Sequence, residues 1–492
     1  MHQYKSGIVI RGEYIDDNLV SFGGRSEGIE FFSPDPHKYV DRLPLGNPVK
    51  LSDLYQLSFE DILDYLVELG KKLNFDTNAH LQESYETACL TSALTPPLIK
   101  TQYQTVQHLF ARGLMREAAE QSIGIEQMEG WKTTTLGDGR ILSIRAFGAR
   151  ALHIIAGNSP LVAAMTVMRN AITRSDAIIK SPSNDPFTAL AIARTMVDMA
   201  PDHPITRHLS VAYWKGGDES IEKQLYQPHV IEKLVAWGGL ASVKHVTKYV
   251  QPGLELVTLD PKRSMSIIGP EALRDEATQR EVAKRLASDI GSSNQEGCVS
   301  ARVVYVLSGT DEQGIATLNE FGRRVYEAML ALPATLSSKP RTMNQDLKAS
   351  INTARLNDEW YNVIGGEDDE GAIIVSQIPE RVDFATLLAN RVANLVPVGS
   401  MEEVFAAVDA YTQTVGIYPE SLKKELRDQL PLYGAQRLTS LGYAGSLSLA
   451  GPQDAIEPLR RMCKWIVEES LDPKIVPPRW ETGLNINAGK YK

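Results

Sequence analysis

A chain of 492 residues is too long for one hydrophobic core and long enough for about two to four domains. Its 43% hydrophobic and 23% charged residues exclude a disordered or fibrous protein, and a formal net charge of -10 without any basic run excludes nucleic acid as an expected partner. No stretch approaches the roughly 18 apolar residues that span a bilayer, and the first residues include no apolar signal segment, so we expect a cytoplasmic protein without a transmembrane segment.

The first third of the chain predicts mixed structure. Residues 56–72 predict a helix, because Phe59, Ile62 and Leu66 recur at helical spacing after Ser58, a favourable N-cap. Further helix is expected up to residue 123. Residues 131–148 then predict a β-hairpin whose turn is Gly137-Asp138-Gly139.

From residue 151 onward, expected strands and helices alternate. Strands are predicted at "ALHIIAG" and "DAIIK", and then at "VIEKLVAWGG", "KYV", "SMSIIG" and "ARVVYVL". This alternation is typical of parallel strands joined by crossover helices, so the region is predicted to be a doubly wound α/β fold. Ligands bind beyond the carboxyl ends of such strands, where "AGNSP", "KSPSND" and "WGGLAS" fall.

The three cysteines have no close pair, which argues against a disulfide framework and against a zinc site. Cys89 and Cys463 lie in helical patterns and are interpreted as small buried hydrophobic residues. Cys298 differs, because it follows Gly297 between an expected helix and an expected strand, where small neighbours leave the thiol approachable. No histidine follows His245, so a papain-like order of catalytic residues is excluded. Position alone leaves a catalytic and a packed thiol both open.

Three segments, in the same order as in the family, resemble the aldehyde dehydrogenase superfamily. "NQEGCVSAR" resembles its active-site cysteine segment, "HIIAGNSPLVAAMTVMRNAI" its asparagine-bearing strand and turn, and "AIIKSPSNDPFTA" its lysine-containing nucleotide-binding turn. Within the superfamily, "WGGLASVK", "LDPKRS" and "LGYAGSLSLAGPQDAIEPLRRMCKWI" are most similar to the LuxC-type acyl-CoA reductases. The resemblance covers about residues 140–470.

The resemblance implies an aldehyde-dehydrogenase-like α/β fold, with a Rossmann-type nucleotide-binding domain, an α/β catalytic domain and a β oligomerisation arm. An arm of this kind implies a homodimer or a homotetramer. The expected boundaries are 1–130 for a helical and mixed part of the cofactor domain, 131–150 for the hairpin arm, 151–270 for the nucleotide-binding domain, 271–440 for the catalytic domain, and 441–492 for a C-terminal return and arm.

For the chemistry, the resemblance implies that Cys298 is the nucleophile. It would accept an acyl group from an acyl-CoA or acyl-protein thioester, a step that is nearly balanced because one thioester replaces another. A reduced nicotinamide would then convert the acyl-cysteine to an aldehyde. Asn158 would donate to the oxyanion beside the Cys298 backbone N–H, although Gly157-Asn158-Ser159-Pro160 is also good turn chemistry. No metal is implied.

The resemblance also implies a set of cofactor-binding residues. Lys180 would reach the ribose or a phosphate, unless it is only a solvated strand end. Ser183 stands where NAD-preferring members carry a glutamate, so NADPH is the expected cofactor with NADH tolerated; alternatively, Ser183 caps a helix beginning near Asp185. The full set is Ala156, Gly157, Lys180, Ser183, Gly238, Gly239 and Ser242, of which the glycine pair precedes a helix whose amides would hold pyrophosphate.

Three departures from the family pattern bear on the reaction. Neither Leu259 nor Asp260 is the glutamate that activates water in hydrolytic members, which favours a reductase. Asn390 is the nearest match to the glutamate that holds the nicotinamide ribose, and Gln453 replaces a histidine. The predicted function is NADPH-dependent reduction of a fatty or other acyl-CoA to an aldehyde. The alternatives are a hydrolytic aldehyde dehydrogenase and a noncatalytic acyl-binding subunit.

Overall fold

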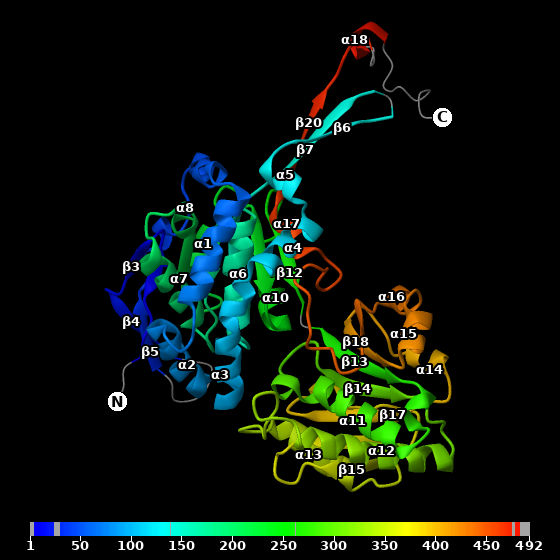
Figure 1. Cartoon of the computed structure of the whole chain (residues 1–492). Coiled ribbons are helices and arrows are strands. Elements are labelled where there is room, and N and C mark those ends of the chain that lie inside the picture. The colour runs from blue at the N-terminus through cyan, green and yellow to red at the C-terminus, as the bar shows by residue number, and fades with distance from the viewer. Residues whose placement is uncertain (1–3, 24–29, 138, 261, 475–477, 483–492) are drawn as a thin grey trace.

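The computed structural model describes residues 4–23, 30–137, 139–260, 262–474 and 478–482. They form two α/β domains and a slender β arm that extends away from the first domain (Figure 1). The doubly wound α/β organisation predicted from the alternating pattern is confirmed. Among these described residues, no helix combines the length and the apolar character needed to cross a membrane.

The first domain is built on a seven-stranded sheet whose central strands are parallel. Alternate residues of one central strand pack into cores on opposite faces: Ile179 into one core and Ile178 into the other. Antiparallel strands from the N-terminal part of the chain complete one edge. In spatial order the strands are β12 (Glu255–Leu259), β11 (Lys233–Trp237), β8 (Arg150–Ile154), β9 (Asp176–Lys180), β10 (Leu209–Ala212), β2 (Ile8–Ile10) and β3 (Glu13–Ile15). A small sheet beside it contains β1 (Tyr4–Lys5), β5 (Glu30–Pro34) and β4 (Leu19–Gly23).

The helices of the first domain begin with α1 (Phe59–Lys72), which Ser58 and Asp61 cap reciprocally. The helix predicted over 56–72 therefore starts where its N-cap indicated. The expected strand at "KYV" is wrong, because Tyr249 lies in a turn, where its hydroxyl donates to Glu222. The remaining helices are α2 (Ala79–Thr91), α3 (Pro96–Thr105), α4 (Arg112–Ser122), α5 (Ile125–Glu129), α6 (Pro160–Ile172), α7 (Thr188–Met199), α8 (Pro204–Arg207), α9 (Glu219–Leu225) and α10 (Leu240–Thr247), with short 3-10 segments η1 (Pro36–Lys38), η2 (Val40–Arg42), η3 (Pro48–Gln56) and η4 (Val106–Phe110).

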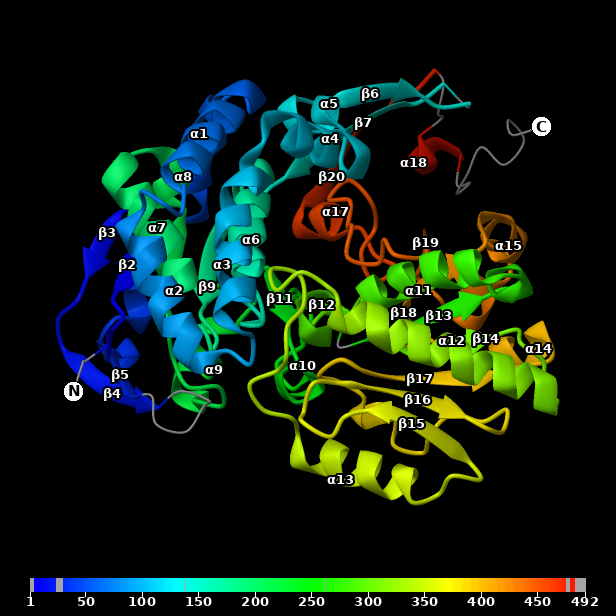
Figure 2. The same cartoon turned by 60° about the horizontal axis from the view of Figure 1, so that its bottom comes forward.

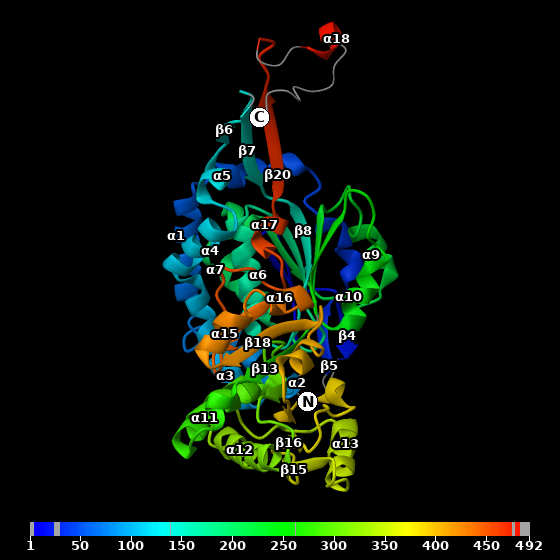
Figure 3. The same cartoon turned by 90° about the vertical axis from the view of Figure 1, so that its right-hand side faces the viewer.

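The arm consists of three antiparallel strands, β6 (Lys132–Thr135), β7 (Ile141–Phe147) and β20 (Lys464–Ser470). The first two form the hairpin expected over 131–148, although Asp138 of its turn lies outside the described residues. The third strand comes from the far end of the chain and runs beside β7 (Figure 3). Helices α17 (Pro458–Met462) and α18 (Arg479–Thr482) flank it in sequence.

The second domain contains another seven-stranded sheet. The expected boundary at residue 270 falls behind β13, whereas β13 pairs with β14 and β18 of this second sheet, so the chain changes domain directly after β12. The sequence pattern could not assign β13 to one of the two sheets, because a buried strand has the same apolar pattern in either sheet. In spatial order the strands are β15 (Tyr361–Gly365), β16 (Ala372–Ser376), β17 (Val392–Pro397), β14 (Ala301–Val306), β13 (Arg263–Ile268), β18 (Thr412–Tyr418) and β19 (Arg437–Ser440). The helices are η5 (Pro270–Leu273), α11 (Glu276–Gly291), η6 (Ser292–Gln295), α12 (Glu312–Leu330), α13 (Gln345–Arg355), η7 (Ala385–Leu387), α14 (Met401–Phe405), α15 (Glu420–Leu426) and α16 (Leu430–Tyr433).

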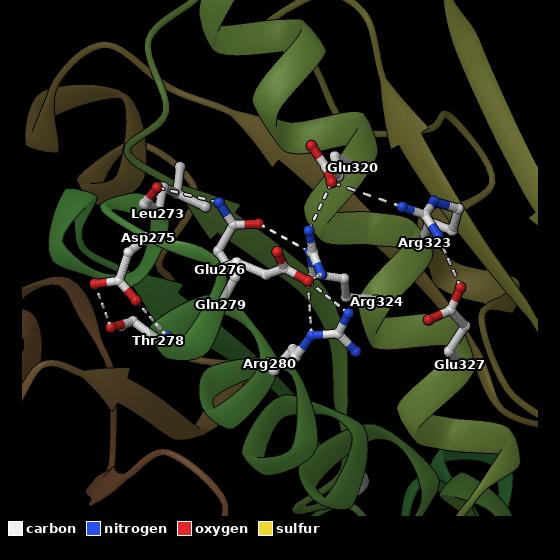
Figure 4. Close-up of polar contacts among 10 residues, drawn as sticks. All are labelled: Leu273, Asp275, Glu276, Thr278, Gln279, Arg280, Glu320, Arg323, Arg324 and Glu327. Carbon is white, nitrogen blue, oxygen red and sulfur yellow. Dashed lines mark hydrogen bonds and ion pairs between the residues drawn. The ribbon is translucent and has the colours of Figure 1, made fainter.

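Helices α11 and α12 lie side by side across one face of this sheet (Figure 2). Arg324, whose side chain is 9% exposed, joins them: its guanidinium donates to Gln279 at 3.1 Å, to Glu276 at 3.2 Å and to Glu320 at 2.6 Å (Figure 4). This contact joins the N-terminal part of α11 to α12, whereas the segment that carries Cys298 follows the other end of α11.

Candidate active site

One cavity of about 640 Å³ lies at the carboxyl ends of β8, β9, β11 and β12 and reaches the segment before β14. Its wall comes from both domains. It brings together all nine residues predicted to be catalytic or cofactor-binding, namely Ala156, Gly157, Asn158, Lys180, Ser183, Gly238, Gly239, Ser242 and Cys298. The rule that ligands bind beyond the carboxyl ends of parallel strands therefore located this cavity correctly.

The backbone leading to Cys298 is strained. Ser293, Asn294 and Gln295 have φ angles of 50°, 52° and 67°, three consecutive left-handed residues of which none is glycine. Each such residue costs on the order of 1–3 kcal/mol and persists only where surrounding contacts hold it. We call residues 292–300, from the end of α11 to the start of β14, the cysteine loop.

Gln295 supplies many of those contacts. Its side chain is buried, its Nε2 donates to the carbonyls of Ala301 at 2.7 Å and Val392 at 3.0 Å, and its Oε1 accepts from the Val392 N–H at 2.9 Å. The cysteine loop is thereby tied to β14 and β17, two central strands of the second sheet.

Arg302 is a second clamp on the cysteine loop. Its guanidinium donates to the carbonyls of Ser300 at 3.0 Å, Gln295 at 3.1 Å and Leu388 at 3.0 Å. Burial lowers its pKa, but it keeps a positive charge next to Cys298 and so favours the thiolate there.

Opposing effects act on the pKa of the Cys298 thiol. Burial raises its pKa, a hydrogen bond from the Gln413 side chain lowers it, the charge of Asp454 raises it and the charge of Arg302 lowers it. The Cys298 carbonyl accepts from the Ser264 hydroxyl at 2.6 Å, which fixes the residue against β13. Ionisation of this thiol therefore depends on the donors and charges around it.

Asn158 lies in the turn between β8 and α6 and reaches across to the other domain. Its Nδ2 donates to the carbonyl of Glu296, two residues before Cys298, at 3.5 Å. The turn itself is stabilised by its neighbour, because the Ser159 hydroxyl accepts from the Leu161 N–H at 3.3 Å at the start of α6. The Asn158 amide is therefore directed at the cysteine loop and not into its own turn.

We call the part of the cavity around Lys180, where the sequence predicts a cofactor, the cofactor half; Lys180 stands at the end of β9. Its ammonium is buried and lies 5.8 Å from the ring centroid of Tyr213 and 5.6 Å from that of Trp214. Burial lowers the pKa of Lys180 to about 8, although the charge of Glu222 acts in the opposite direction. Lys180 is therefore not a solvated strand end.

Ser183 follows in the same turn. Helix α7 begins at Thr188, whose N–H and hydroxyl donate to Asp185 at 3.0 and 2.7 Å, so Asp185 and not Ser183 stabilises this helix start. Ser183 instead lines the cavity. A Cβ on Gly157 would lie 2.8 Å from the Cγ of Pro182, an atom of a rigid ring, so glycine at position 157 allows this turn to approach β8 closely.

The residues at the start of α10 suit a phosphate group. A Cβ on Gly239 would meet nothing within 4 Å, so the backbone borders open space, and no side chain in the described chain caps the first turn of α10. Free amides at a helix N-terminus bind anions. With Lys180 on the same cavity, the residues fit a dinucleotide.

The structure adds Glu296 to the candidate residues of the cavity and excludes Asn390. Leu259 and Asp260 line the cavity as expected, with Pro261 outside the described residues, but Glu296 lines it as well, and burial raises its pKa while Arg302 lowers it. The only sequence signal for Glu296 was its place two residues before the cysteine. Asn390 lies in the turn before β17 and does not line the cavity.

The comparisons with known sequences point to thioester reductases. The long-chain acyl-protein thioester reductase of Aliivibrio fischeri is 30% identical over 322 residues, which are 65% of this chain and 64% of that protein. The match thus spans less than two thirds of that relative. The enzyme of the same name from Vibrio harveyi is 23% identical over 470 residues, 94% of this chain and 92% of that protein.

Solved structures with the same fold are aldehyde dehydrogenases, which confirms the predicted fold class. NADP-dependent glyceraldehyde-3-phosphate dehydrogenase from Bacillus halodurans superposes with a TM-score of 0.70 and 12% identity, over 95% of this chain and 99% of that one. Lactaldehyde dehydrogenase from Escherichia coli gives a TM-score of 0.70 and 14% identity, over 95% and 100%. A sequence model described as acyl-CoA reductase (LuxC) matches residues 54–465, and the chain therefore belongs to the LuxC family.

Proposed function

We propose that this protein reduces an acyl thioester to an aldehyde through a covalent acyl-cysteine at Cys298. The observation that carries the proposal is the shared cavity: a thiol on a clamped loop of one domain, the Asn158 amide of the other, and a phosphate-binding helix start at the far end. Membership of the LuxC family and the names of the relatives support the same reaction class.

In the first step the Cys298 thiolate attacks the thioester carbonyl. The new Sγ–C bond forms and the C–S bond to the donor breaks, and the donor thiolate leaves and takes up a proton. The oxyanion formed on the way would accept from the Asn158 amide and the Cys298 N–H. A bound reduced nicotinamide would supply a hydride to the acyl carbon. The Sγ–C bond then breaks, giving the aldehyde and the free Cys298 thiolate.

We propose NADPH as the cofactor, with NADH tolerated. Lys180 and the start of α10 would hold phosphate groups, and Ser183 places no negative charge where a 2′-phosphate would lie. The phosphate-binding backbone includes Gly238 and Gly239.

For the substrate we propose a fatty acyl group carried by coenzyme A or by an acyl-protein, the second in line with the names of the relatives. The arm would join two or four copies of the chain. Its edge strand β20 exposes Ile466 and Val467, which are 43% and 54% exposed.

The test starts without cofactor. Mixing the protein with acyl-CoA should give an acyl adduct on the peptide that contains Cys298, seen by mass spectrometry, and later addition of NADPH should release the aldehyde and oxidise the nicotinamide. Cys298→Ala should abolish both events, whereas Cys89→Ala and Cys463→Ala should keep them, because Cys463 is buried and Cys89, in α2, does not line the cavity.

Two other outcomes would replace the proposal. Release of acid in place of aldehyde would favour a hydrolytic enzyme, for which Glu296 in the cavity is the specific observation. Absence of any adduct with a range of acyl donors would favour a noncatalytic acyl-binding subunit.

A further inference from the structure

A histidine for which the sequence predicted no role lines the cavity. His245 belongs to α10, the helix whose first turn suits a phosphate group, and its side chain is 29% exposed. Its Nε2 is bonded to Glu222, whereas within the described residues its Nδ1 has no hydrogen-bond partner. The ring of His245 therefore keeps one nitrogen available for a ligand.

The carboxylate of Glu222 fixes this ring. Glu222 belongs to α9, and its side chain is 2% exposed. Its Oε2 accepts from the His245 Nε2 at 2.7 Å and from the Tyr249 hydroxyl at 2.8 Å, and its Oε1 accepts from the Gly217 N–H at 3.0 Å. An ionised carboxylate can only accept, so a proton lies on the His245 Nε2. Because Glu222 does not itself line the cavity, the histidine stands between a buried anion and the cavity.

The loop after β10 places His245 at the same end of the cavity as Lys180. The Lys180 ammonium lies 5.6 Å from the ring centroid of Trp214, near the start of this loop. Three residues later, a Cβ on Gly217 would lie 3.9 Å from the Cε1 of His245. One short loop thus contacts both side chains, and Ser183 lines the cavity from the turn that follows Lys180. Two nitrogen-bearing side chains and a hydroxyl therefore border the end of the cavity where a 2′-phosphate is expected.

We propose that His245 is a further specificity-determining residue, whose imidazole donates a hydrogen bond to the 2′-phosphate of NADPH. A carboxylate and a phosphate on either side of an imidazole both accept hydrogen bonds, so together they favour the form with a proton on each nitrogen. NADH carries a hydroxyl at the 2′ position and would gain no charge-assisted bond of this kind. The inference rests on the proposed function in taking NADPH as the cofactor.

The experiment measures binding without turnover. Calorimetry at pH 7, below the pKa of about 8 of Lys180, gives the dissociation constants of NADP⁺ and NAD⁺ for the whole chain without an acyl donor. His245→Gln keeps a donor for Glu222 but carries no positive charge. NADP⁺ should therefore bind about tenfold more weakly to this variant, whereas the constant for NAD⁺ should change by less than about twofold.

Two further variants separate charge from position. His245→Arg keeps a positive charge beside Glu222, so the ratio of the two dissociation constants should stay within about threefold of its value in the unsubstituted protein. His80→Gln is the matched control, because the His80 Nε2 also pairs with a carboxylate, that of Asp198 at 2.8 Å, but His80 does not line the cavity. It should leave both constants unchanged. Thermal unfolding of each variant identifies any that is misfolded.

Equal weakening of NADP⁺ and NAD⁺ in folded His245→Gln would overturn the inference, because it would place His245 against a part that both nicotinamides share. An unchanged NADP⁺ constant would also overturn it, as would a ratio in His245→Arg that falls as far as in His245→Gln. These results would leave the proposed reduction intact, because the acyl adduct on Cys298 is measured without cofactor. If the unsubstituted protein bound neither nicotinamide, the proposed function would fail and this inference with it.

Discussion

The cofactor half and the catalytic half of the cavity are shaped by different parts of the chain, namely by backbone in the first and by side chains in the second. The cofactor half is formed by exposed backbone, with Gly157, Gly238 and Gly239 at the turns and a helix start without a side-chain cap. In the catalytic half, a strained loop is held by side chains, chiefly Gln295 and Arg302. A phosphate group needs access to backbone amides, whereas a nucleophilic sulfur must be fixed at one point. Substitutions in the first half should thus change cofactor binding, and those in the second should change the chemistry.

Asn158 gives the largest expected effect and is the exception to this division. It belongs to the first domain, yet its amide reaches the cysteine loop. Asn158→Ala should keep covalent acylation detectable and slow turnover by roughly 10²- to 10³-fold, the usual effect of losing an oxyanion donor. Steady-state kinetics with acyl-CoA would measure it. If the turnover rate fell by less than about threefold, Asn158 would be only a turn residue, and no residue of the cofactor half would contribute to the chemistry.

Ser183 tests the cofactor half alone. Ser183→Glu places a carboxylate where a 2′-phosphate is expected, so the Michaelis constant for NADPH should rise by at least about tenfold, with that for NADH little changed. The rate of acylation without cofactor should not change. Equal effects on both nicotinamides would show that Ser183 does not face the 2′ position.

Lys180 provides a pH dependence confined to the same half. With a pKa lowered to about 8, its ammonium is charged below that pH and neutral above it. A charged group attracts phosphate, so binding of NADP⁺, measured by calorimetry, should weaken severalfold as the pH rises through about 8. Lys180→Gln should bind weakly at every pH and lose this step. The control is Lys215→Gln, because Lys215 is exposed and does not line the cavity.

Substitution of Arg324 should have the smallest effect on the reaction and should instead lower the stability of the protein. Arg324→Met should lower the free energy of unfolding by about 1–3 kcal/mol, because Glu276, Glu320 and Gln279 lose a buried partner. Arg323→Met is the control, since Arg323 is 55% exposed and its pairs contribute at most about 1 kcal/mol. Thermal unfolding would compare them. Equal melting temperatures would mean that the α11–α12 contact does not depend on Arg324.

Where local pattern and family motif coincide, the residues predicted from the sequence line one cavity of the structure. Lys180 ends β9 and Asn158 follows β8, places that the alternation of strands and helices predicts, whereas Cys298 precedes β14 and was singled out by the family motif. Ser58 likewise predicted the start of α1, because capping is a contact between residues close in sequence.

Contacts between segments that are far apart in the sequence were not predicted. Gln413 and Asp454 become neighbours only when the second sheet forms and the segment after β19 returns to the first domain, so no spacing along the chain could pair them. For the same reason the pattern assigned β13 to the wrong domain: its apolar residues required burial but did not specify a sheet.

The pairing of β20 with β7 has a consequence for how the protein is made. On the ribosome, the arm and the contact of α17 with β12 remain incomplete until the last strand has emerged, because Phe147 finds its partner only at Lys464. The whole catalytic domain lies between these partners, and closing so long a loop costs chain entropy. Once that domain folds, its own compactness brings the two ends of the loop together. We therefore expect completion of the first domain to follow folding of the second, although the first is mostly translated earlier.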